Sequence, residues 1–145
     1  MPFAVNSGPP TYLQPGIGDA GSYQVSGIPY ATASVATTTT VKEVVFPYVT
    51  SWVYIVQHTN DDLRVGFSAN GVNDGYYFLL PGAGTNGQSA TVTLPFKVTS
   101  LFFRCDDTAK TIPFTLCAGL TGIPTQDLQY SGPNGPNWSG SAGVG

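Results

Sequence analysis

Residues 51–68, SWVYIVQHTNDDLRVGFS, decide the fold class of this chain. In their second half, Leu63, Val65 and Phe67 alternate with charged or small residues. A period of two is the pattern of a β-strand that buries one face and leaves the other in water. This half of the stretch predicts a strand over residues 62–68.

The first half of the same stretch is apolar on both faces of the predicted strand. Trp52, Tyr54 and Val56 share one face, and Val53 and Ile55 lie on the other. A strand that is apolar on both sides is typical of the centre of a sandwich, and one of its faces can also meet a partner. We therefore expect residues 51–58 to form a central strand.

Short strands of the same kind recur along the chain, and turn signals separate them roughly every ten residues. Aromatic residues make up 12% of the sequence and long runs of helix-forming residues are absent, which favours strands over helices. The chain predicts an all-β domain, an eight-stranded antiparallel two-sheet jelly-roll sandwich. The candidate strands lie near 22–26, 35–46, 51–58, 62–68, 76–80, 90–98, 100–105 and 111–118.

The turn signals suggest how these strands are joined. Thr59–Asp61 is short enough for a compact hairpin, and Asp106–Lys110 is expected to close another reversal. Asn70-Gly71 and Asp74-Gly75 are the dipeptides of tight turns. We expect irregular turns at all four places.

The composition divides the chain into three parts. Residues 1–40 are rich in Gly, Pro, Ser and Thr and are expected to form an extended N-terminal arm, with room for one short strand. Residues 41–123 hold the jelly roll. Residues 124–145 form a Gly/Pro-rich tail around Trp138, for which docking on the domain and plain disorder both remain open.

The charge content indicates extensive contact with other proteins. Only 9% of the residues are charged, against about a quarter in an ordinary soluble domain. A surface of Thr, Ser, Asn and aromatic residues suits contact with protein, although a secreted Thr/Ser-rich module remains an alternative. The net charge of −3 and only five Lys and Arg leave no basic stripe for nucleic acid.

The sequence predicts a soluble protein made in the cytosol. Met1-Pro2-Phe3 opens without the basic residues of a signal peptide, and no segment has the roughly 20 apolar residues that span a bilayer. In that compartment Cys105 and Cys117 are expected to stay reduced. Their positions in the alternating pattern also place them on opposite faces.

No catalytic, cofactor or metal site is predicted. Residues 82–87 match the G-x-G-x-x-G pattern, but the following residues predict a strand where a dinucleotide site needs a helix. His58 is the single histidine, and no nucleophile for acyl transfer is evident beside it. Glu43 is the single glutamate, so a carboxylate pair for acid/base catalysis is also lacking. The Asp residues gather at turns, where turn chemistry is the simpler explanation and calcium binding in an assembly the alternative.

Five segments carry a resemblance to a known family: residues 44–50 (VVFPYVT), 52–56 (WVYIV), 63–72 (LRVGFSANGV), 101–104 (LFFR) and 118–123 (AGLTGI). The chain resembles single jelly-roll capsid proteins of large icosahedral DNA viruses over residues 41–123. The resemblance is weaker over residues 21–30 (GSYQVSGIPY). The resemblance brings no catalytic residue with it.

What the resemblance implies is a non-enzymatic shell subunit, most simply a penton protein that closes a five-fold vertex as a homopentamer. Its partners would be copies of itself and neighbouring major or minor capsid proteins, in a virion assembled in the host cytoplasm. Aromatic residues suit interface cores, so Trp52, Tyr54, Tyr76 and Tyr77 are the expected contacts, with a role in the domain core as the alternative. The alternatives are a minor cement or decoration protein and a carbohydrate-binding sandwich that takes a glycan receptor.

Overall fold

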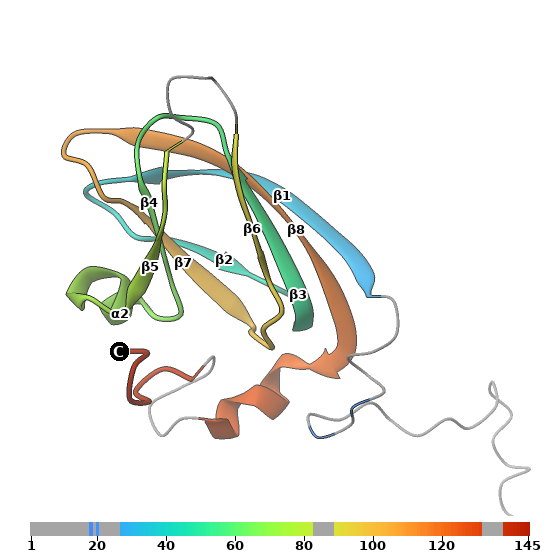
Figure 1. Cartoon of the computed structure of the whole chain (residues 1–145). Helices are drawn as coiled ribbons and strands as arrows, with labels where there is room; N and C mark the ends of the chain where they lie inside the picture. Colours follow the sequence, from blue (N-terminus) through green and yellow to red (C-terminus); the bar gives the residue numbers. More distant parts are fainter. Residues whose placement is uncertain (1–17, 19, 21–26, 83–88, 132–137) are drawn as a thin grey trace, which may run out of the picture.

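A computed structural model describes residues 18, 20, 27–82, 89–131 and 138–145 of the 145-residue chain. It confirms an all-β fold of eight strands in two four-stranded antiparallel sheets (Figure 1). One short helix, α2 (Ala69–Asp74), joins two strands, and a 3-10 helix, η2 (Thr125–Ser131), follows the last one. The strands are β1 (Ile28–Thr37), β2 (Lys42–Val45), β3 (Tyr48–Gln57), β4 (Leu63–Gly66), β5 (Tyr77–Leu80), β6 (Ala90–Leu94), β7 (Ser100–Cys105) and β8 (Thr111–Pro124).

The order of the strands is that of a jelly roll. One sheet has the order β1-β8-β3-β6 and the other β2-β7-β4-β5. Of the consecutive strands, β4 and β5 pair directly, and each other connection passes from one sheet to the other. This crossing pattern is how a jelly roll wraps a chain around one core.

The core lies between the sheets and follows the period-two patterns of the sequence. Leu63 and Val65 of β4 and Val53 and Ile55 of β3 are fully buried, as the alternation predicts. Strand β3 lies between β8 and β6, which confirms its central position. The largest side chains of the core are Phe46, Phe103, Phe114, Ile55, Leu63, Leu101 and Ile112.

Two of the expected hairpins are wrong. The segment Thr59–Asp61 joins β3 to β4, and Asp106–Lys110 joins β7 to β8, so each connects strands of different sheets. Gln57 closes the first of these corners. Its Nε2 donates to the carbonyl oxygens of Asp61, Leu80 and Pro81 at 2.9, 3.1 and 2.9 Å.

The expected tight turns at Asn70-Gly71 and Asp74-Gly75 are also wrong, because helix α2 contains both Asn70-Gly71 and Asp74. Ser68 caps its start, since the Ser68 hydroxyl accepts from the Gly71 N–H at 2.8 Å. Gly75 ends it with a φ of 102°, a left-handed conformation that glycine adopts without strain. The same residue types that favour turns here supply the two ends of a helix.

The ends of the sandwich extend beyond the expected domain limits. Strand β1, with ten residues, lies inside the range 1–40 that was expected to be an arm with room for one short strand. The expected strand near 22–26 lies outside the described residues. In the tail, Leu128 and Trp138 pack on Val49 and Ile123, so the described part of the tail docks on the domain.

Candidate functional site

The outer face of the β1-β8-β3-β6 sheet carries no charged side chain at its described outward positions. The alternation of buried and exposed residues fixes which side chains point outward, and the register aligns them in rows across the four strands. We call this surface the uncharged face. Its residues are Pro29, Ala31, Ala33 and Val35 of β1, Pro113, Thr115, Cys117 and Gly119 of β8, Trp52, Tyr54 and Val56 of β3, and Thr91 and Thr93 of β6.

The charged side chains gather on the other sheet. Arg64 of β4 lies next to Asp106, with 2.6 Å between Nε and Oδ1. Arg104 of β7 donates from Nε to the Thr38 carbonyl at 2.8 Å and from Nη1 to Asn73 Oδ1 at 2.6 Å. The two outer faces therefore differ in chemistry, and the uncharged one is the candidate interaction surface.

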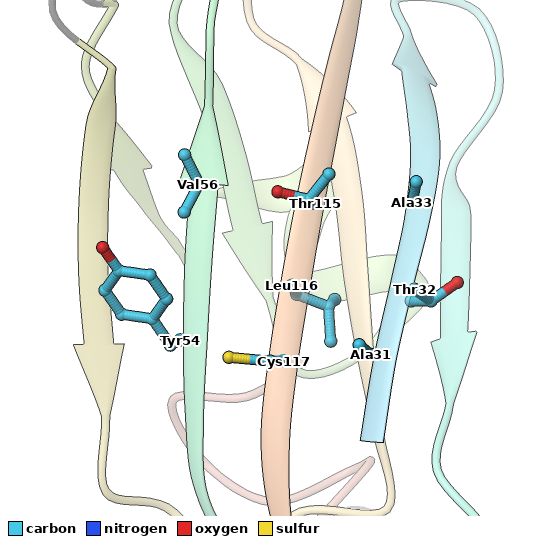
Figure 2. Close-up of a pocket in the computed structure, with 8 residues that line it drawn as sticks. All are labelled: Ala31, Thr32, Ala33, Tyr54, Val56, Thr115, Leu116 and Cys117. Carbon is cyan, nitrogen blue, oxygen red and sulfur yellow. The ribbon is translucent and has the colours of Figure 1, made fainter. Parts of the chain in front are cut away.

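A shallow groove of about 430 Å³ runs along the uncharged face (Figure 2). Thr115 and Cys117 of β8 form its floor, and Tyr54 of β3 forms one side. On the other side β1 contributes Ala31 and Ala33, whose small side chains leave the space open. No charged residue lines the groove, and most of its lining surface is apolar, so its chemistry suits apolar contact.

Trp52 lies directly on Gly119 at one end of this face. A Cβ atom added at Gly119 would come within 2.3 Å of the indole Nε1 of Trp52. The side chain is nonetheless 38% exposed, so the ring has one face against the backbone and part of its surface in water. Glycine at position 119 is what allows the ring to lie flat on the sheet.

Gly119→Ala is expected to lower the free energy of unfolding by about 1–3 kcal/mol, because the new methyl group displaces the Trp52 ring. Urea unfolding followed by circular dichroism measures the loss. In a Trp52→Ala background the same change should cost much less, since all three of the nearest atoms to the new Cβ belong to Trp52. Equal costs in the two backgrounds would contradict this packing.

The four predicted interface residues do not form one patch. Trp52 and Tyr54 lie on the uncharged face, whereas Tyr77 lies on β5 in the other sheet and Tyr76 immediately precedes that strand. The Arg64 guanidinium lies over the Tyr77 ring, 4.4 Å from its centroid. The structure brings together only the first two of the four, and their role in contacts stays a prediction.

The residues weighed for chemistry occupy ordinary structural positions. His58 follows β3, is exposed, and has its Nδ1 2.6 Å from the Ser89 hydroxyl. Cys105 is buried in the core, Cys117 is half-buried on the uncharged face, and both thiols are free. Of residues 82–87, Gly82 alone is described, and strand β6 begins at Ala90, where a dinucleotide site needs a helix.

Two further observations concern metals and membranes, and both apply to the described ranges alone. Within them, no group of three or more His, Cys, Asp or Glu side chains lies close enough to hold a metal ion. In the same part of the chain, no helix has the length and apolar character to cross a membrane.

The small residues that open the groove and the glutamine that closes a corner were not predicted from the sequence. Ala31 and Ala33 lie in a segment of strict alternation, residues 30–36, whose outward positions are Ala, Ala and Val. That period was the available signal, but the small Ala, Thr and Ser side chains give a weak contrast between the two faces, and the surrounding Gly/Pro-rich composition obscured it. Gln57 is polar and fully buried, and no pattern in the neighbouring residues predicts its burial.

Comparisons with known proteins leave the family of this chain open. No family model matches the sequence, and no curated protein matches it. Among solved structures, a chain of the Bacillus endospore appendages, described as disulfide-linked pili, is 13% identical, covers 66% of this chain and 89% of its own length, and has a TM-score of 0.34. A likeness at this level carries no conclusion about function.

Proposed function

We propose that this chain is a structural subunit of a viral capsid, a penton protein that closes five-fold vertices as a homopentamer. The observation that carries the proposal is the uncharged face on a jelly-roll domain with the strand order β1-β8-β3-β6 and β2-β7-β4-β5. The sequence resemblance to single jelly-roll capsid proteins gives the five-fold position. Fold alone does not define function, so the chemistry of the surface is what supports a role in assembly.

The uncharged face supports the proposal because its removal from water is favourable. Burial stabilises an outer sheet face that exposes Trp52, Val35 and the apolar part of Tyr54. The free energy falls by about 25 cal/mol for each Å² of apolar area that leaves water. It has no charged group at its described positions whose desolvation would oppose burial. A face of this kind is suited to standing contact with neighbouring shell proteins, both further copies and major or minor capsid proteins.

The proposal leads to a specific mass in solution. We expect light scattering of the purified chain to give about 76 kDa, five times the chain mass of 15.2 kDa, over a range of concentrations. Because the contacts lack charge, this mass should stay constant from low salt to about 1 M salt. A persistent monomer would contradict the pentamer and favour a cement, decoration or glycan-binding role.

A matched pair of variants tests which sheet makes the contacts. Val35 on β1 and Val45 on β2 are both exposed valines, 49% and 60%, and they lie on different sheets. Val35→Lys should reduce the mass toward that of a single chain, because it places a charge on the uncharged sheet. Val45→Lys should leave the mass unchanged. If both variants keep the full mass, the contacts lie elsewhere.

A further inference from the structure

Within the described residues, the two edge strands of the uncharged sheet, β1 and β6, lack the charges, bulges and mid-strand prolines that normally protect a sheet edge. An edge presents unpaired backbone N–H and C=O groups, and soluble proteins guard it with charges, prolines, bulges or very short strands. Neither β1 nor β6 contains a charged residue, and each pairs with its neighbour in an unbroken register. Pro29 and Pro95 lie at strand ends and leave the middle of each strand free.

The edges of the other sheet differ. Strand β2 has four residues and begins with Lys42 and Glu43, and β5 has four residues and is followed by Pro81. Strand β1 is also incompletely covered on its inner side, because the core-facing residues Tyr30, Thr32 and Ser34 are only half-buried. The inner side of the sandwich is therefore partly open along the β1 edge.

The directions of the strands favour head-to-tail pairing. Each neighbour in the order β1-β8-β3-β6 is antiparallel, so β1 and β6 run in opposite directions. A second copy, rotated about an axis without being turned over, can place its β1 beside β6 of the first copy in antiparallel pairing. A contact between two different surfaces of the same chain is the kind that closes into rings.

We propose that β6 of one copy pairs with β1 of the next, so that the uncharged sheet continues from subunit to subunit around the ring. This inference rests on the proposed pentamer and names its contact. The side chains agree with it, because outward Thr91 and Thr93 would lie beside outward Ala31, Ala33 and Val35. Such pairing brings the edge rows of the uncharged face of two copies into contact, and the rest of that face stays available to other shell proteins.

Disulfide trapping tests the pairing. Residues directly opposite each other on paired strands have Cβ atoms about 4.5–5.5 Å apart, close to the distance that a disulfide needs. In a Cys117→Ser background, which removes the native thiol of this face, Ala33→Cys is combined with Thr91→Cys in one protein and with Thr93→Cys in another. Odd-numbered residues point outward on both strands, and pairing that aligns the centre of β6 with the centre of β1 places Ala33 opposite Thr91 or Thr93, so one of these two variants should cross-link.

The expected result is a ladder of cross-linked chains that stops at five on a non-reducing gel and collapses to one band on reduction. The control combines Ala33→Cys with Val45→Cys, which lies on an edge of the other sheet, and should give no ladder. A dimer from Ala33→Cys alone would overturn the proposal, because it would mean that β1 pairs with β1.

The outcomes separate this inference from the proposed function. A mass of five chains with no cross-linking in either double variant would overturn the β1–β6 contact and leave the pentamer standing. A ladder that continues past five chains would support the contact and contradict five-fold closure.

Discussion

Phe114→Ala is expected to lower the free energy of unfolding by about 3–5 kcal/mol, a large part of the 5–15 kcal/mol that stabilises a typical domain. Phe114 of β8 is buried and stacks on Phe103 of β7, with 4.3 Å between ring centroids and 30° between ring planes. The pair joins the two sheets at the centre of the core. Its loss leaves a cavity that neither sheet can fill without moving.

Equilibrium unfolding in urea, followed by tryptophan fluorescence and circular dichroism, measures this loss. Tyr76→Ala is the control, because Tyr76 is an exposed aromatic residue and its removal should change stability by no more than about 0.5 kcal/mol. A loss below about 1 kcal/mol for Phe114→Ala would show that the two rings do not hold the sheets together.

Gln57→Leu is expected to cost roughly 2–4 kcal/mol although leucine is more apolar and similar in size. The amide of Gln57 is fully buried. Its Oε1 accepts from the Thr59 hydroxyl at 2.9 Å, and its Nε2 donates to three carbonyl oxygens. In the leucine variant, the three carbonyls and the Thr59 hydroxyl lose this hydrogen-bond partner at a buried or partly buried position. The corner between β3 and β4 and the end of β5 should loosen together.

Urea unfolding gives the size of this effect, and hydrogen exchange around residues 59–61 and 80–82 gives its location. His58→Leu is the matched control, since it makes a similar replacement at the next residue, on an exposed side chain. It should have little effect on stability or exchange. Similar losses for the two variants would mean that the hydrogen bonds of Gln57 are not what stabilises the corner.

The fold class could be predicted because strong alternation survives in the sequence wherever large apolar residues face the core. Leu63 and Val65 show it for β4, and Val53 and Ile55 show it for β3. Strand β1 was assigned to an arm because its residues are mostly Ala, Thr and Ser, which give a weak contrast between faces. A local pattern identifies a strand more easily when the side chains that the strand buries are large.

The connections and the helix could not be predicted from local signals. Turn residues at 59–61 and 106–110 show where the chain reverses, but which sheet receives the next strand depends on the whole topology. Helix α2 needs Ser68 and Gly75 as caps, and Ser68 also donates to the carbonyl of Val144, 76 residues away. Such distant contacts override the turn preference of Asn-Gly.

The candidate surface was predicted in part. Trp52 and Tyr54 were expected as contacts, and both lie on the uncharged face. Tyr76 and Tyr77 were grouped with them because aromatic residues look alike in a sequence, whereas the structure assigns them to the other side of the sandwich. Which side chains share a surface depends on the pairing of β3 with β8, and that is a long-range property.

The pairing of β1 with β8 has a consequence for the synthesis of this protein on the ribosome. Among the described strands, β1 pairs with β8 alone, and Ile28 is paired with Leu120, 92 positions further along the chain. Strand β1 must therefore wait for β8, the last of the described strands, before it can pair. Contacts of such long range make folding slow, so the nascent chain spends most of its translation with an uncharged strand exposed. We expect its yield in cells to depend on chaperones and on the rate of translation more than its final stability would suggest.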